Sequence, residues 1–98
     1  MSSFQPLAAA ADRETAPRFA RFLVQARAEP GVMPRVVELF AKRGLVPHKW
    51  SSATAGEALT IDVRIGGVEG ELAGYIARCM RQIAGVETVL TSETRTAG

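Results

Sequence analysis

The hydrophobic residues between positions 19 and 94 recur with a period of two in some stretches and of about 3.6 in others. The order of these stretches constrains the fold more than any other feature of the chain. The alternating residues are Phe22, Val24, Ala26 and Ala28 in a first stretch and Leu59, Ile61, Val63 and Ile65 in a later one. Such alternation is typical of a strand with one buried face. The sequence therefore predicts two inner strands.

Two other stretches have helical spacing. Apolar residues that share one helical face are Met33, Val36, Val37 and Phe40, flanked by Val32 and Leu39, and later Leu72, Ile76, Met80 and Ile83, widened by Ala73 and Ala77. Each pattern predicts an amphipathic helix. Pro34 fits the first turn, where no intrahelical hydrogen bond is lost, and Gly44 and Gly85 are suitable stops.

The two remaining strands have weaker signals. Residues 45–57 alternate poorly and contain Pro47, which cannot donate to a ladder, so we expect an edge strand there. Thr54, Ala55 and Gly56 supply a turn that joins this strand to the next in a hairpin. Residues 86–94 then predict a short final strand.

The resulting order is βαββαβ, which predicts an α+β, ferredoxin-like fold. Right-handed crossovers give a four-stranded antiparallel sheet of order 4-1-3-2, with two helices on one face. We assign residues 18–94 to this domain. Residues 1–17, which lack a sustained period, are expected to form a flexible N-terminal extension, and residues 95–98 a polar tail.

Composition excludes several kinds of partner. The chain has 98 residues, enough for one core, and a formal net charge of +2 from 12 Lys and Arg against 10 Asp and Glu. This mixed balance argues against nucleic acid or an anionic membrane as partner, and the third predicted strand lacks the aromatic residues of an RNA-binding sheet. No apolar run approaches the length of a membrane span. A single cysteine, Cys79, favours a cytoplasmic setting.

The junction Glu29–Met33 between the first strand and helix is the best candidate for a site. A glycine at position 31 lets the backbone turn and leaves unpaired N–H groups at the start of a helix, which can hold a carboxylate. The alternative is that Gly31 only makes the turn.

Elsewhere the sequence shows no catalytic centre, metal site or cofactor motif. His48 and Cys79 lack partners at a useful spacing, and the acidic residues are dispersed. Trp50 is expected either at a dimer interface or packed beneath a helix.

The run EPGVMPRVVELFAKRGL resembles the opening helix of ACT domains. Within that superfamily the closest resemblance is to the small regulatory subunit of acetolactate synthase, also called acetohydroxyacid synthase, in its short form with a single ACT domain. The residues that carry it are Gly31, Val32, Arg35, Val36, Leu39, Phe40, Arg43 and Gly44.

The resemblance implies a non-catalytic regulatory subunit in branched-chain amino acid biosynthesis. It implies a homodimer formed through an edge strand and the first helix, and a complex with the thiamine-diphosphate-dependent catalytic subunit of acetolactate synthase. An effector amino acid, typically valine, would bind at the dimer interface. Its site would comprise Glu29, Pro30, Gly31, Val32 and Met33, with Val46 and Pro47 as the opposing wall.

Within this site, the N–H groups of residues 31–33 would hold the carboxylate of the effector. Valine-responsive members usually have a polar residue near the positions of Ala28 and Val46, which are apolar here. Glu29 would have to compensate the ammonium group. The alternative function is a stand-alone ACT module that senses an amino acid and regulates a different enzyme.

Overall fold

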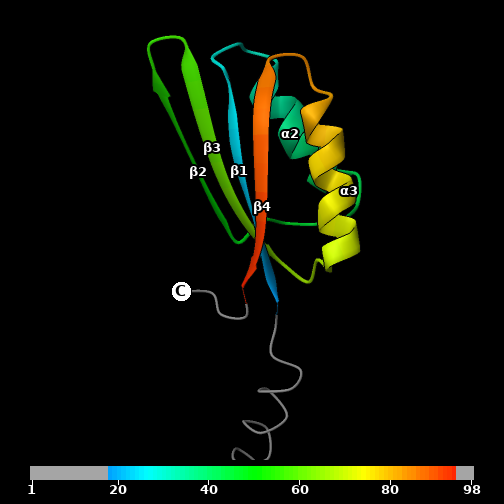
Figure 1. Ribbon diagram of the computed structural model, residues 1–98. Helices are drawn as coiled ribbons and strands as arrows, with labels where there is room; N and C mark the ends of the chain where they lie inside the picture. Colours follow the sequence, from blue (N-terminus) through cyan, green and yellow to red (C-terminus); the bar gives the residue numbers. More distant parts are fainter. Residues whose placement is uncertain (1–17, 95–98) are drawn as a thin grey trace, which may run out of the picture.

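The computed structural model describes residues 18–94 and contains the six predicted elements in the predicted order. They are β1 (Phe19–Arg27), α2 (Val32–Ala41), β2 (Lys49–Ala55), β3 (Ala58–Gly66), α3 (Gly70–Arg81) and β4 (Val86–Thr94). The strands form one antiparallel sheet of order β2-β3-β1-β4, which is the predicted order read from the other edge. Both helices cover the same face of the sheet (Figure 1). The predicted extension over residues 1–17 and tail over residues 95–98 lie outside the described residues.

The core lies between the two central strands and the helices. The alternating residues of β1 and β3 are buried, as predicted: Ala20, Phe22, Val24, Ala26, Leu59, Ile61, Val63 and Ile65. The rings of Phe22 and Phe40 meet edge-to-face, with their centroids 5.7 Å apart. The prediction was wrong at Ala28, because β1 ends at Arg27 and Ala28 is exposed in the loop that follows.

The helices bury a narrower stripe than the sequence predicts. In α2 the buried residues are Val32, Val36 and Phe40, whereas Val37 is 45% exposed. The reason is geometric, since each residue advances about 100° around a helix and position 37 therefore turns away from the sheet. In α3 the buried residues are Ala73, Ile76, Ala77 and Met80, and Leu72 and Ile83 pack only at the margin of the core.

The hairpin turn lies further along the chain than predicted. Thr54 and Ala55 still belong to β2, and the two-residue turn consists of Gly56 and Glu57. Gly56 has φ 61°, as the first central residue of a tight hairpin turn requires. β2 is an edge strand, as predicted, but it begins after Pro47. No described helix is long and apolar enough to cross a membrane.

Candidate ligand-binding loop and helix edge

The loop between β1 and α2 lies at the end of the sheet where two other connections meet it. The Arg27 backbone N–H donates to the Gly85 carbonyl at 2.8 Å, and the Ala28 N–H donates to the Glu57 carbonyl at 2.9 Å. These bonds tie the loop to the α3–β4 connection on one side and to the β2–β3 turn on the other (Figure 1). The predicted site residues from Glu29 to Met33 therefore sit on a braced loop.

The Glu29 carboxylate already has a partner. Both Nε and Nη2 of Arg27 donate to its Oε2, at 3.0 and 2.9 Å. The role of Glu29 in compensating a ligand ammonium group therefore stays a prediction, and such a ligand would share the carboxylate with Arg27. Sequence reasoning missed the pair because Arg27 lies on the opposite face of β1 from the core and reads as a solvated charge.

The turn at Gly31 does not depend on glycine. Its φ and ψ of −82° and −8° are helical values that any residue adopts. An added Cβ would meet only the guanidinium group of Arg35, the far end of a flexible side chain. Among the three predicted carboxylate donors, the N–H of Val32 donates to the Glu29 carbonyl at 3.2 Å.

The predicted opposing wall of the site, Val46 and Pro47, lies near the end of the sheet that is opposite the β1–α2 loop. Val46 and Pro47 precede β2, whose first residue, Lys49, pairs with Arg64 near the end of β3. The β1–α2 loop instead follows Arg27, which pairs with Ala58 at the start of β3. One copy of the chain thus keeps the two halves of the predicted site apart. Val46 is 82% exposed.

Three residues near the loop were missed as parts of a site: Arg27, Glu57 and Gly85. A hollow of about 350 Å³ is lined by Arg27, Ala28, Glu29, Gly56 and Glu57. Gly85 has φ 96°, and a Cβ there would lie 2.9 Å from Glu29 Oε1 and 3.0 Å from Val32 Cγ2. The sequence marks Gly85 only as a helix stop, because its contacts are made by residues more than fifty positions away.

The N-terminal end of α2 lies over the outer strand β2. The Ser52 hydroxyl is 3.8 Å from the sulfur of Met33, so the edge strand and the first helix share one side of the domain. On the opposite edge, Nη2 of Arg81 donates to the Val89 carbonyl of β4 at 2.7 Å. The Arg81 side chain therefore occupies part of the β4 edge, where a strand of a second molecule could otherwise pair.

No catalytic or metal-binding role is expected for His48 or Cys79, and both lie within the folded domain. The His48 ring lies 4.6 Å from the Phe19 ring, and Cys79 is partly buried in α3. Trp50 is partly buried against the core, which favours packing beneath the helices over a dimer contact. Within residues 18–94 no group of His, Cys, Asp or Glu side chains could hold a metal ion.

Together these features define a ferredoxin-like domain. Its β1–α2 loop is fixed by hydrogen bonds to two other connections and lies near the open edge formed by β2. A sequence model described as ACT-like domain matches residues 12–97, and the chain belongs to that family. ACT domains are regulatory modules and not catalysts. Neither this match nor the structural comparisons point to acetolactate synthase in particular.

Solved structures with the same fold are distant in sequence. The crystal structure of the ACT domain from GTP pyrophosphokinase of Chlorobium tepidum is 13% identical, with a TM-score of 0.69, and the match covers 78% of this chain and 99% of that one. The solution structure of the same domain is 14% identical, with a TM-score of 0.65, over 76% and 84%. The C-terminal domain of MgtC from Mycobacterium tuberculosis is 14% identical, with a TM-score of 0.66, over 85% and 94%. A comparison with curated proteins found no match.

Proposed function

We propose that this chain is a homodimeric regulatory module that binds a small amino acid between two copies of its ACT-like domain. The observation that carries the proposal is the separation of the predicted site into two halves at opposite ends of one sheet. A two-fold axis beside β2 and perpendicular to the sheet would run the two β2 strands antiparallel. Val46 and Pro47 of one copy would then lie beside the Glu29–Met33 loop of the other.

The surroundings of the two outer strands, β2 and β4, support this arrangement. The β2 edge and α2 lie together, with Met33 and Ser52 in contact, and the apolar side chain of Val37 is exposed on the same helix. The β4 edge is partly occupied by Arg81. An interface at β2 and α2 would cover Val37 and leave α3 exposed. A cytoplasmic setting, expected from the single cysteine, stays a prediction.

Substituting Val37→Glu is expected to convert the dimer into a monomer. A carboxylate at the centre of an apolar helix contact would lose its hydration without a partner, which opposes association. Tyr75→Glu is the matched control, because Tyr75 is also 45% exposed but lies on α3. Sedimentation velocity at micromolar concentration measures both variants. A wild-type monomer, or equal dissociation of both variants, would contradict the proposed interface.

Amino acid binding is tested by calorimetry with valine, leucine and isoleucine. We expect heat of binding with wild type and with Tyr75→Glu, and none with Val37→Glu, because the monomer holds only half of the site. If the dimer forms but none of the three amino acids binds, the dimer proposal stands and the sensing proposal fails. Binding to monomeric Val37→Glu would show that one copy contains the whole site.

The narrower proposal is that the regulated enzyme is acetolactate synthase. It rests on the resemblance of the first helix, although the structure gives half of the eight resembling residues a role in the fold. Val32, Val36 and Phe40 are core residues, and Gly44 ends the α2 turn with φ 68°. Such residues would serve any ACT domain, so the stand-alone module is the broader alternative. Co-purification with the thiamine-dependent catalytic subunit separates them, since the narrower proposal requires that complex.

A further inference from the structure

The sheet face opposite the helices carries three basic side chains in a line across three neighbouring strands. The register pairs Arg21 of β1 with Arg64 of β3, and Arg64 with Lys49 of β2. Directly paired residues in antiparallel strands project from the same face. The neighbours of Arg64 in β3, Val63 and Ile65, are buried on the helix side. Arg21, Arg64 and Lys49, here called the basic row, therefore project from the open face.

Within residues 18–94, the carboxylate that forms a salt bridge with the basic row is that of Asp62. Asp62 accepts hydrogen bonds from Arg21 at both oxygens, from Nε at 3.0 Å and from Nη2 at 2.7 Å. These bonds lower the pKa of Asp62 below its ordinary value of 3.8, so it stays ionised and bound to Arg21 at neutral pH. Within residues 18–94, neither Arg64 nor Lys49 forms a salt bridge. They face each other as like charges, an arrangement that destabilises a sheet.

The net positive charge of the described chain is concentrated at this place. The basic row and Asp62 comprise three cationic groups and one anionic group. The other residues between 18 and 94 contain seven Lys and Arg side chains and seven Asp and Glu side chains, so they balance. The row and Asp62 together carry a net charge of +2, which matches one doubly charged anion.

A small hollow in the same face is lined by Lys49, Ser51, Asp62 and Arg64, with a volume of about 140 Å³. Ser51 pairs with Asp62 and so shares the open face, where its hydroxyl can donate to an anion. We propose that this hollow binds the phosphate group of a small molecule. A phosphate carries a charge of about −1.5 to −2 at pH 7, whereas a carboxylate would offset half of the excess. Arginine and lysine side chains both bind phosphate oxygens.

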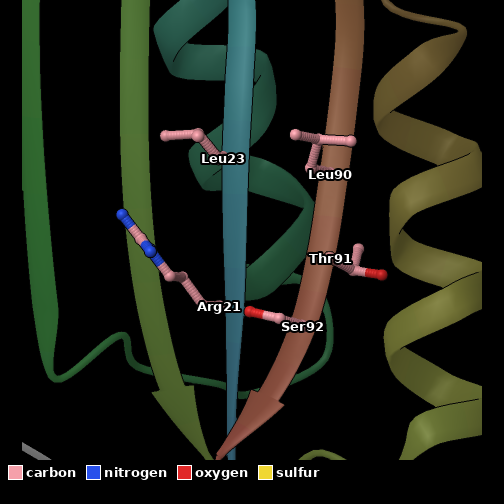
Figure 2. A pocket seen from close by; sticks show the side chains of 5 residues that line it. All are labelled: Arg21, Leu23, Leu90, Thr91 and Ser92. Atoms are coloured by element: carbon pink, nitrogen blue, oxygen red, sulfur yellow. The ribbon is translucent and has the colours of Figure 1, made fainter.

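An apolar hollow lies on the other side of the Arg21–Asp62 pair. It is lined by Arg21, Leu23, Leu90, Thr91 and Ser92 and has a volume of about 330 Å³. Figure 2 shows Leu23 and Leu90 on the neighbouring strands β1 and β4, with the Arg21 side chain reaching across β3. Leu90 is 65% exposed. The organic part of a phosphate monoester could cover these leucines, whereas free phosphate would leave them exposed.

The test is an NMR titration of amide shifts in ¹⁵N-labelled full-length chain, with inorganic phosphate and with phenyl phosphate, each exchanged for chloride at constant ionic strength. We expect saturable shifts at Lys49, Ser51 and Arg64 with both probes. Tighter binding of phenyl phosphate, with added shifts at Leu23, the first apolar residue beyond Asp62, would identify an ester as the ligand class. Equal affinity would identify free phosphate.

Two double variants with the same loss of charge provide the control. Lys49→Gln/Arg64→Gln should abolish the saturable shifts, whereas Lys42→Gln/Arg78→Gln, on the helix side, should keep them. Phosphate should also raise the Tm of wild type but not that of Lys49→Gln/Arg64→Gln. In chloride, the Tm of that variant should lie close to that of wild type, because the substitutions remove both the repulsion between the two cations and their attraction to Asp62.

Shifts that do not saturate, or that both double variants lose equally, would overturn the phosphate site. So would a Tm increase that survives in Lys49→Gln/Arg64→Gln. The site lies on the face opposite α2 and needs neither a dimer nor a bound amino acid. Its failure would therefore leave the proposed regulatory function untouched, and the reverse also holds.

Discussion

Phe40→Ala is expected to lower the free energy of unfolding by about 3–5 kcal/mol. Phe40 is 1% exposed and packs edge-to-face on Phe22, so the substitution leaves a cavity between α2 and the sheet. Small domains have total stabilities of about 5–15 kcal/mol, and the loss would consume a large share of this. Urea denaturation followed by the fluorescence of Trp50, the single tryptophan, measures it.

Two further variants make this result interpretable. Phe40→Leu keeps most of the volume and should cost less than about 1.5 kcal/mol, so it remains measurable if Phe40→Ala does not fold. Tyr75→Ala also removes an aromatic ring, but Tyr75 is half exposed and contacts Arg43 and Arg78 at the surface. It should cost about 1 kcal/mol or less. Equal losses for Phe40→Ala and Tyr75→Ala would show that α2 does not pack on the sheet as described.

The spacing of hydrophobic residues was sufficient to predict the fold, because each strand and helix can be recognised from neighbouring residues in the sequence. The alternation of Leu59, Ile61, Val63 and Ile65 requires a half-buried strand, and two crossovers of fixed hand allow few arrangements of four strands. Errors occurred where the pattern ends. Ala28 continues the alternation of β1 in the sequence, but the chain has already left the sheet to begin the loop.

The surface features could not be predicted because they depend on register. Arg21, Lys49 and Arg64 are far apart in the sequence, and only the pairing of three strands aligns them. The composition counts the same charges but shows only a small net charge for the whole chain, without their positions. The Arg27–Glu29 ion pair was likewise hidden, since its formation depends on the direction in which the chain leaves β1.

Gly85 is the position where local and distant requirements coincide, and Gly85→Ala should destabilise the domain by at least about 2 kcal/mol. A left-handed backbone conformation costs an alanine about 1–2 kcal/mol, and Gly85 has φ 96°. The new Cβ would also lie 3.0 Å from a methyl group of Val32, which is 1% exposed and cannot move without disturbing the core.

Two other glycines separate these contributions. Gly44→Ala introduces left-handed strain, at φ 68°, with no atom within 4 Å of the new Cβ, and so measures the backbone cost alone. Gly31→Ala has an ordinary φ and meets only the mobile end of Arg35, so its effect should be close to zero. Urea denaturation should rank the losses as Gly85→Ala, then Gly44→Ala, then Gly31→Ala. If Gly31→Ala were instead the most damaging, the glycine of the β1–α2 loop would be required for the turn itself. The close approach of Glu29 and Val32 to Gly85 would then matter less to stability than the turn at Gly31.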